Sequence, residues 1–481
     1  MSKAAIGWDQ VDPVPNNHQF SDFLQMRGGK LFLDGLDLDA VLTDGAAGDR
    51  LSSPLEIVYL PIIREKISQL ENAFQQAIDQ TGYPGKFIYT YASKANAAEE
   101  VIRTILESGV NYELSSWIDV AIVKLMQANK ILSDDKLIIC NGFKPPGTPY
   151  AEKIIELQKL RKNVIPVIED QVEISSFAQS GVNFDVGLRL KSYGTHQDLQ
   201  AMDRANSRFG MDFQLVKEAA AQIEQAPNLN LKLFHAMVGS QINDEDGFVS
   251  RLTPAIERYA QLRQAHHSLE IFDFGGGVPV QQTLNFAFDY QLMAELLLTK
   301  IMEICSQYDL PVPDVMGEMG RYTVAEHGAH IFKVVTAKDN RSKLPWYIID
   351  GSIMSSFPDV WALGEKFVVL PLNHLDEAFQ SVQLGGITCD SDDVYPPESS
   401  QLPLFLPENT ENLYIGFFNI GSYQEMLGGV GGSKHCVIPE ANELVVDKDQ
   451  HGNFVFTKIR GQSAENVLQN LGYQQKEIKE T

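Results

Sequence analysis

Between residues 56 and 320, short apolar runs alternate with longer stretches in which apolar residues recur every three or four positions. The short runs have the length of buried strands, and the longer stretches have the period of amphipathic helices. Helical periodicity is clearest at 98–108, 117–129 and 289–308. The strand-like runs number eight, at 87–91, 110–114, 136–140, 164–168, 184–190, 231–237, 269–274 and 312–318. Eight strands joined by helices predict an α/β fold, a closed (β/α)8 TIM-like barrel.

The pattern changes near residue 340 to short β-type runs separated by proline and glycine. These runs lie at 346–350, 366–372, 413–418, 436–440, 443–446 and 453–459. They predict a second, mostly antiparallel β domain. We therefore expect an N-terminal segment over 1–55, a barrel over 56–335 and a C-terminal β domain over 336–481. The N-terminal segment is polar, with one expected strand at 30–38 that joins the β domain, and the tail from 463 predicts a short amphipathic helix.

Composition narrows the choice of partners. The chain has 63 acidic and 39 basic residues, a formal net charge of −24, which disfavours nucleic acid and anionic membranes. Such a surface either aids solubility or attracts a cationic substrate. The sequence shows no membrane-spanning run, signal-peptide pattern, CxxC pair or HExxH motif. We expect a cytoplasmic protein without a metal site.

Polar or flexible residues follow the strand-like runs, with one set for each strand. The carboxyl ends of barrel strands meet at one rim, where barrel enzymes build their active sites. In chain order these residues are Lys94 and Asn96, Glu113, Asn141, Glu169, Arg189, Gly239-Ser240-Gln241, Gly275-Gly276-Gly277 and Glu318-Met319-Gly320-Arg321. We therefore expect the active site at this rim.

Several of these residues suggest a chemistry. A lysine near a desolvated strand end, such as Lys94, can form a Schiff base, although a surface lysine with a buried stem is the simpler alternative. The three glycines expose N–H groups that can approach a phosphate, or they allow close packing. Arg321 after Gly320 suits a clamp on the same phosphate. Glu318 suits a pyridine nitrogen, because a carboxylate keeps that nitrogen protonated.

Two loops of the β domain carry further reactive groups. Cys389-Asp390 places a thiol beside a carboxylate in a loop rich in glycine and aspartate, where a structural core cysteine is not expected. Tyr423 follows Gly421-Ser422 and offers a phenol to a phosphate or a substrate. Either segment alone is also compatible with an ordinary loop.

In this order, the motifs resemble a known family, the fold type III pyridoxal-phosphate decarboxylases, and within it the biosynthetic arginine decarboxylases. The resemblance covers roughly residues 55–440. Its motifs are YASKAN (91–96), YELSS (112–116), IICNGFK (138–144), LRLKSYG (188–194), NSRFGM (206–211), DFGGG (273–277), GEMGR (317–321), SFPDVWALGEKFVVLPLNHLDE (356–377), CDSDD (389–393) and GSYQEMLGG (421–429).

The resemblance implies a role for each matching residue. Lys94 would hold pyridoxal 5'-phosphate as a Schiff base, Glu113 would line the cofactor site, and Glu318 would pair with the pyridine nitrogen. Cys389 would protonate the carbanion, and Asp390 and Asp359 would meet the cationic end of the substrate. The phosphate would be held by Ser240, Gly275, Gly276, Gly277, Gly320, Arg321 and Tyr423. The family shares its sites across a dimer, so an obligate homodimer is implied.

The chain departs from the family pattern in two places. The family reads His-x-Gly-Ser where this chain has Met237-Val238-Gly239-Ser240, so Met237 takes the place of the imidazole that stacks on the cofactor, and His235 lies one strand repeat earlier. The stretch between Arg321 and Trp346 is too short for the inserted helical region of longer arginine decarboxylases. The expected reaction is decarboxylation of L-arginine to agmatine and CO2, in polyamine biosynthesis. The alternatives are an ornithine, lysine or diaminopimelate decarboxylase, or a catalytically silent regulatory homologue.

Overall fold

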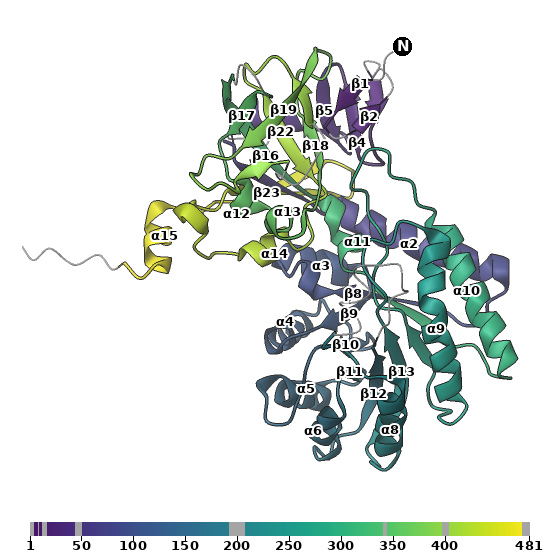
Figure 1. Ribbon diagram of the computed structural model, residues 1–481. Helices are drawn as coiled ribbons and strands as arrows, with labels where there is room; N and C mark the ends of the chain where they lie inside the picture. The colour runs from purple at the N-terminus through teal and green to yellow at the C-terminus, as the bar shows by residue number, and fades with distance from the viewer. Residues whose placement is uncertain are drawn as a thin grey trace, which may run out of the picture. The chain divides into compact units, whose positions relative to one another are not determined.

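A computed structural model describes residues 4–7, 9–11, 17–43, 51–191, 207–339, 344–396 and 404–473. The chain divides into two compact units, whose elements are labelled in Figure 1. The barrel unit comprises Arg64–Val280 and Phe288–Thr323, and the β unit comprises Met1–Ile63, Gln281–Ala287 and Val324–Thr481. Within the described ranges, no helix is long and apolar enough to cross a membrane.

Eight parallel strands form a closed barrel, in which β15 pairs with β8 to complete the ring. All eight strands predicted from the sequence are confirmed. They are β8 (Phe87–Ala92), β9 (Asn111–Leu114), β10 (Ile138–Cys140), β11 (Val164–Ile168), β12 (Phe184–Leu190), β13 (Leu229–Ala236), β14 (Ile271–Asp273) and β15 (Asp314–Glu318). Branched side chains such as Ile139, Val167 and Leu233 form a buried cluster among the strands, as expected for a filled barrel.

Amphipathic helices lie around the barrel strands, as Figure 1 shows. They include α2 (Leu60–Thr81), α3 (Glu99–Glu107), α4 (Trp117–Ala128), α5 (Pro149–Leu160), α6 (Ile174–Ala178), α8 (Phe213–Glu224), α9 (Glu245–Arg263) and α10 (Tyr290–Gln307). The three helices with the clearest periodicity are confirmed as α3, α4 and α10. Ser116 and Asp119 form a capping box that starts α4 directly after β9, so local sequence fixes where the strand-end loop stops.

The β unit contains a ten-stranded mixed sheet and a small four-stranded sheet. The large sheet is mostly antiparallel, and only β7–β23 and β17–β19 pair in parallel. Its strands are β7 (Leu55–Tyr59), β16 (Gly328–Lys338), β17 (Trp346–Ile349), β18 (Val368–Pro371), β19 (Phe379–Gly385), β20 (Val394–Tyr395), β21 (Leu404–Pro407), β22 (Tyr414–Phe418), β23 (Asn442–Lys448) and β24 (Phe454–Ile459). The small sheet holds β3 (Asn17–Gln19), β4 (Leu24–Arg27), β5 (Lys30–Leu33) and β6 (Leu36–Asp37), and β1 (Ala4–Ile6) pairs with β2 (Asp9–Val11).

Three boundaries differ from the expectation. The expected barrel range of 56–335 is too wide, because β7 pairs with β16 and β23 inside the β unit. The single strand expected at 30–38 is a hairpin, since Asp34 and Gly35 turn the chain with positive φ before α1 (Leu38–Thr43). The strand expected at 436–440 is instead a 3-10 turn, η4 (His435–Val437), because Cys436 and Val437 also have positive φ.

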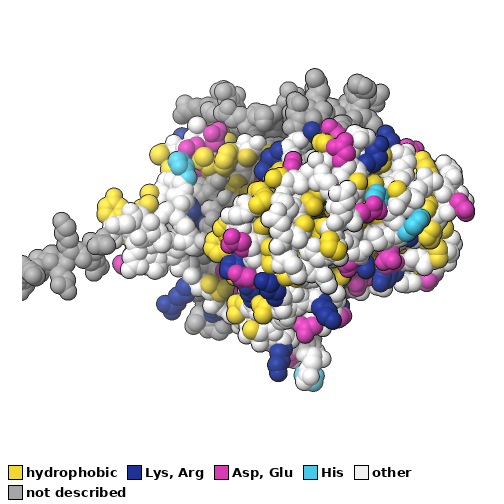
Figure 2. All heavy atoms as spheres, turned by 90° about the horizontal axis from the view of Figure 1, so that it is seen from below, with side chains coloured by type: hydrophobic (Ala, Val, Ile, Leu, Met, Phe, Trp, Pro, Cys, Tyr) yellow, Lys and Arg dark blue, Asp and Glu magenta, His cyan; other side chains and the backbone are white. Residues whose placement is uncertain are grey.

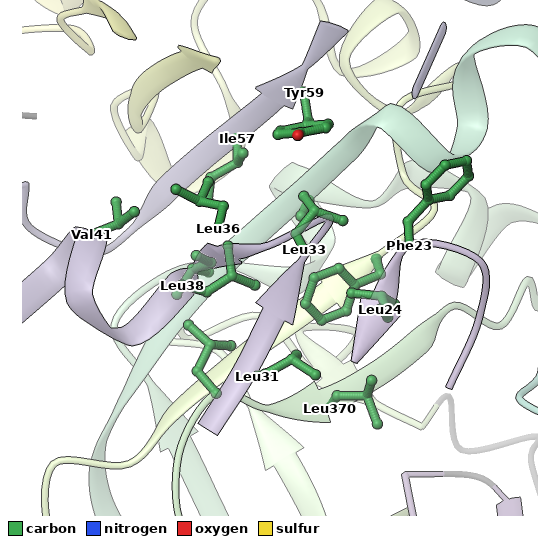
Figure 3. Close-up of a cluster of buried hydrophobic side chains, with 14 of the residues drawn as sticks. Phe23, Leu24, Leu31, Leu33, Leu36, Leu38, Val41, Ile57, Tyr59 and Leu370 are labelled. Atoms are coloured by element: carbon green, nitrogen blue, oxygen red, sulfur yellow. The ribbon is translucent and has the colours of Figure 1, made fainter. Parts of the chain in front are cut away.

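The N-terminal hairpin is part of the core of the β unit. Figure 3 shows Leu31, Leu33 and Leu36 among Ile57 of β7 and Leu370 of β18. All five side chains are nearly or fully buried. The N-terminal segment therefore joins the β unit through apolar packing, as the sequence predicted.

Charged groups of both signs are mixed on the face seen in Figure 2, where hydrophobic side chains also show between them. The acidic excess of the chain therefore does not form a uniform negative field on this face. The expected tail helix is confirmed as α15 (Ala464–Asn470), and the charged residues after 473 lie outside the described part of the chain.

Candidate active site

Lys94 lies at the barrel rim, directly after β8, in the short 3-10 turn η1 (Ser93–Ala95). The Tyr91 hydroxyl holds this turn, because it donates to Asn96 O at 2.7 Å and accepts from the Asn96 N–H at 3.1 Å. The Lys94 Nζ is 3.8 Å from Glu113 Oε2 on β9. The lysine side chain is half exposed and the glutamate is fully buried, so the rim holds an accessible ammonium against a buried carboxylate.

Asn141, which follows β10, joins two buried carboxylates. Its Nδ2 donates to Glu113 Oε1 at 2.9 Å and to Glu318 Oε1 at 2.7 Å. An amide NH2 group has two hydrogens, so one side chain can satisfy both acceptors. The ends of β9, β10 and β15 are tied together by this group. The sequence marked Asn141 only as a strand-end residue, since the link to Glu318 crosses 177 positions.

His235 and Asp273 are two further buried groups beside Glu318. The His235 Nδ1 is 2.8 Å from Asp273 Oδ2 and 3.7 Å from Glu318 Oε1. Polar atoms of the three side chains all lie within 4.8 Å of one another. The parallel pairing of β13 with β14 sets His235 opposite Asp273. Asp273 was not predicted as a site residue, although its position two residues before the glycine loop was an available signal.

Burial controls the protonation of these groups. It raises the pKa of Glu113 to about 7, against the opposing charge of Lys94. It also raises the pKa of Asp273 to about 7 and, with the charge of Asp273, raises the pKa of Glu318. Burial lowers the pKa of His235 to about 4, so this ring is neutral near pH 7. Carboxyl groups that titrate near neutrality are typical of functional sites.

The three glycines form a tight loop that contacts Met237. The Gly276 N–H donates to Met237 Sδ at 3.3 Å. A Cβ on Gly275 would lie 2.9 Å from that sulfur, and one on Gly277 would lie 2.5 Å from Gly239 O. Gly275 and Gly277 also have φ of +68° and +98°, which favour glycine. Close packing therefore requires glycine here, and the Gly275 N–H donates to Asp273 Oδ1 at 2.8 Å.

The other barrel residues predicted for the site lie on neighbouring loops. Ser240 is exposed and follows Gly239. Gly320 packs against the lysine turn, because a Cβ there would lie 3.1 Å from Ala95 Cβ. Arg321 begins α11 (Arg321–Val324) just after β15. The structure thus brings the lysine turn and the Gly320 loop together at the rim.

Glu169 and Arg189 form a separate ion pair at the ends of β11 and β12. The Arg189 Nη1 is 2.6 Å from Glu169 Oε1, and the Gly210 N–H donates to Glu169 Oε2 at 2.9 Å. Burial works to raise the pKa of Glu169, but the charge of Arg189 and these hydrogen bonds hold it below its ordinary value. Residues 192–206, within the motif at 188–211, lie outside the described residues.

The β unit carries the remaining predicted residues. Cys389 is exposed, and the neighbouring Asp390 places Oδ2 2.7 Å from His435 Nε2. Tyr423 has a φ of +68° and immediately precedes α14 (Gln424–Gly428). The sequence did not predict the contact of His435, because this residue lies 45 positions from Asp390 and just before the segment expected to be a strand.

Asp359 has a different environment from Asp390. It lies in α13 (Pro358–Leu363) and is 2% exposed. Its Oδ2 accepts from Gln424 Nε2 at 2.8 Å, and its N–H donates to Gln424 Oε1 at 3.2 Å. Among the described residues, no hydrogen bond or ion pair joins Asp359 to Asp390. The Asp359 carboxylate therefore holds the segment next to Tyr423.

The barrel residues fit pyridoxal phosphate, the cofactor that the resemblance implies. In the described part of the chain, Glu113 Oε2 and Asn141 Oδ1 are buried acceptors with no hydrogen-bond donor, which a bound polar molecule can supply. Unmet buried acceptors are rare and call for such an explanation. The glycine loop suits a phosphate, and the half-exposed Lys94 amine suits a carbonyl carbon.

Comparison with known proteins agrees with this fit. Residues 63–325 match the family described as "Pyridoxal-dependent decarboxylase, pyridoxal binding domain". The chain is 24% identical to a biosynthetic arginine decarboxylase of Phocaeicola vulgatus, over 93% of this chain and 88% of that protein.

Solved structures show the same fold. A biosynthetic arginine decarboxylase of Campylobacter jejuni superposes with a TM-score of 0.78 at 20% identity, covering 94% of this chain and 89% of that chain. A diaminopimelate decarboxylase of M. jannaschii in co-complex with L-lysine gives a TM-score of 0.79 at 18% identity, covering 94% and 98%. The family match extends over more than half of the sequence, and its strands carry the lysine, carboxylates and glycine loop described above. The chain belongs to the pyridoxal-dependent decarboxylase family and has the fold type III architecture.

Proposed function

We propose that this protein uses pyridoxal 5'-phosphate to decarboxylate L-arginine, giving agmatine and CO2 for polyamine biosynthesis. The observation that carries the proposal is the Lys94 amine beside Glu113, with Asn141 linking Glu113 to Glu318. The choice of arginine is supported by relatives named arginine decarboxylases at 21–24% identity over about nine-tenths of this chain.

Barrel residues would hold the cofactor. Lys94 would bind it through Nζ, Glu113 would line its site, and Glu318 would hold a proton at the pyridine nitrogen. Met237 would cover one face of the ring. The phosphate would meet Ser240, the loop of Gly275, Gly276 and Gly277, and then Gly320, Arg321 and Tyr423. When bound, pyridoxal phosphate supplies an electron sink for the electron pair released as CO2 leaves.

The protein's own side chains would donate and accept protons and would pair with the charges of the substrate. Glu113, with a pKa of about 7, can take up or release a proton beside the Lys94 amine near neutral pH. His235 is neutral and hydrogen-bonds Asp273, so it adds no positive charge beside Glu318. Cys389 would deliver a proton to the substrate α-carbon after CO2 departs. Asp390 would pair with the cationic end of the substrate, and the buried Asp359 would position Gln424 and Tyr423.

The active form would be a homodimer in which the loop containing Cys389 serves the partner's barrel. Large apolar side chains of the β unit are exposed on α13, on the loop that contains Cys389 and on the segment that follows Tyr423. Such exposure is common at protein interfaces. These side chains are Trp361, Leu363, Ile387, Leu427, Val430 and Val437, each at least 50% exposed. We expect this enzyme in the cytoplasm, where its four free cysteines would stay reduced.

A second candidate substrate is diaminopimelate. The fold similarity to the M. jannaschii diaminopimelate decarboxylase is as high as that to the arginine decarboxylase. Ornithine and lysine are further alternatives within the same reaction class, and a silent homologue would catalyse none of these reactions. A substrate panel separates them.

Lys94→Ala should lose both the absorbance of the covalently held cofactor and turnover, because no other amine lies in its place beside Glu113. Lys86→Ala is the matched control, since Lys86 is 71% exposed and forms only a surface ion pair. The measurement is the absorbance spectrum with added pyridoxal phosphate, followed by borohydride reduction and peptide mapping. Recovery of the cofactor on another lysine would refute the assignment.

CO2 release should favour L-arginine over ornithine, lysine and diaminopimelate by at least about tenfold in kcat/KM, because a site that pairs with a guanidinium rejects shorter amines. Asp390→Asn should raise the KM for arginine, whereas Asp392→Asn, a neighbouring exposed change, should leave it near the wild-type value. Equal or faster turnover of diaminopimelate or ornithine would move the enzyme to that alternative.

Mixed dimers test the shared site. Lys94→Ala and Cys389→Ala proteins should each be inactive, and mixing them should restore roughly a quarter of wild-type activity if subunits exchange freely in a symmetric dimer. Mass spectrometry of differently tagged chains verifies the exchange. Hybrid dimers with no activity would exclude a site shared between subunits.

Met237→Ala should weaken pyridoxal phosphate binding by up to about tenfold, since a sulfur–aromatic contact contributes roughly 0.3–1.5 kcal/mol. Met237→His should retain binding, because an imidazole can also cover the ring. Titration of the apoprotein with cofactor gives both dissociation constants. An unchanged constant and spectrum in Met237→Ala would show that this residue does not contact the ring.

A further inference from the structure

A buried carboxylate, that of Asp393, holds the loop that contains Cys389. Asp393 is 2% exposed. It accepts from Ile353 N–H at 2.7 Å and from the Thr388 hydroxyl and N–H at 2.6 and 3.1 Å. The Asp390 N–H donates in turn to the Thr388 hydroxyl at 3.3 Å. Cys389 therefore lies between two fixed residues.

A second segment of the β unit lies against this loop. The His435 Nε2 is 2.7 Å from Asp390 Oδ2, and the Ser355 hydroxyl donates to His435 O at 3.4 Å. The next residue, Cys436, has a φ of 55°. This left-handed conformation is strained for a non-glycine residue, and such outliers often mark a functional position.

The two thiols are neighbours. The Cys436 thiol is within hydrogen-bonding reach of the Cys389 thiol and of the Thr388 side chain, and partial burial and then the adjacent Cys389 raise the pKa of Cys436. Cys389 is exposed and Cys436 half-buried, while Cys140 and Cys305 are fully buried. The contact between Asp390 and His435 thus joins the two segments, and the thiols of Cys389 and Cys436 are neighbours beside it.

We propose that Cys389 and Cys436 are a redox modification site, at which a peroxide converts the two thiols into a disulfide. The effect on catalysis rests on the proposed function, because the disulfide would remove the proton donor Cys389 and tie Asp390 to η4. The pairing itself rests only on the contacts of the two segments.

The chemistry balances with hydrogen peroxide as the named oxidant. The exposed Cys389 sulfur attacks one peroxide oxygen, the O–O bond breaks, and a sulfenic acid and one water form. The Cys436 sulfur then attacks the Cys389 sulfur, the S–S bond forms, the S–O bond breaks and a second water leaves. The two sulfur atoms lose two electrons in total, the peroxide gains them, and the thiol protons end in water. A dithiol reductant reverses the change.

The test uses the purified holoenzyme. After limited hydrogen peroxide and alkylation of free thiols, peptide mass spectrometry should find Cys389 linked to Cys436, with the pair lighter by two hydrogens. Cys140 and Cys305 should be unlinked in the same sample, and dithiothreitol should release the linked pair. Activity should fall on the order of 100-fold, as expected when a general acid is lost, and should return with dithiothreitol.

Cys436→Ser is the matched variant. It keeps Cys389, so basal activity should equal wild type, but no linked peptide should form, and peroxide should instead leave Cys389 as a sulfenic acid or a higher oxidised acid. Oxidised wild type without the linked peptide would overturn the proposal. A linked peptide without loss of activity would leave the redox site intact and instead contradict the role of Cys389. If Cys389→Ala is inactive but oxidised wild type forms no linked peptide, the proposed function is supported and only the redox inference fails.

Discussion

Glu113 and Glu318 are buried carboxylates from opposite ends of the barrel sequence, and one amide group of Asn141 donates to both. Burying a charge without compensation is costly, so the two acids can lie at one rim only because donors reach them and their pKa values rise. The other charged and polar groups of the site are arranged around these two acids. A cation at Lys94 faces one acid and a neutral imidazole faces the other. Burial raises the pKa of both acids, to about 7 for Glu113. A cofactor with a basic ring nitrogen suits such an environment, because its protonated form is stabilised by the carboxylate.

The sequence predicted the barrel closely, because each strand is a short apolar run bounded by turn residues and each helix keeps its own period. The β unit was harder to predict. β7 lies next to the barrel elements in sequence, and only pairing with β16 and β23 reveals its sheet. The turn at Cys436 depends on backbone conformations that its residue types disfavour, so an apolar run was taken for a strand.

As with the fold, the site residues that the sequence revealed have a local signal, and those that it missed depend on contacts between distant parts of the chain. Lys94, Glu318 and the three glycines stand out because their residue types are unusual at strand ends. Asn141 and Asp273 do not, since an asparagine or aspartate after a strand is ordinary turn chemistry. Their significance comes from partners on other strands, at distances that only the closed barrel defines. Likewise, Asp359 looked like a ligand for a cation, but its burial against Gln424 indicates a positioning residue.

Met237 illustrates how one residue can retain part of a role. Its sulfur accepts from the Gly276 N–H, and Gly275 is too close to it to carry a side chain. A thioether is polarizable and flexible, so it can pack on an aromatic ring and adjust when a phosphate takes up the N–H groups of the loop. It cannot carry charge or donate a hydrogen bond. Under the proposed assignment, His235, neutral and bonded to Asp273, would leave the polar contacts beside the ring to the carboxylates. A methionine in place of a stacking imidazole would then be compatible with a site whose electrostatics depend on Asn141, Glu318 and Asp273.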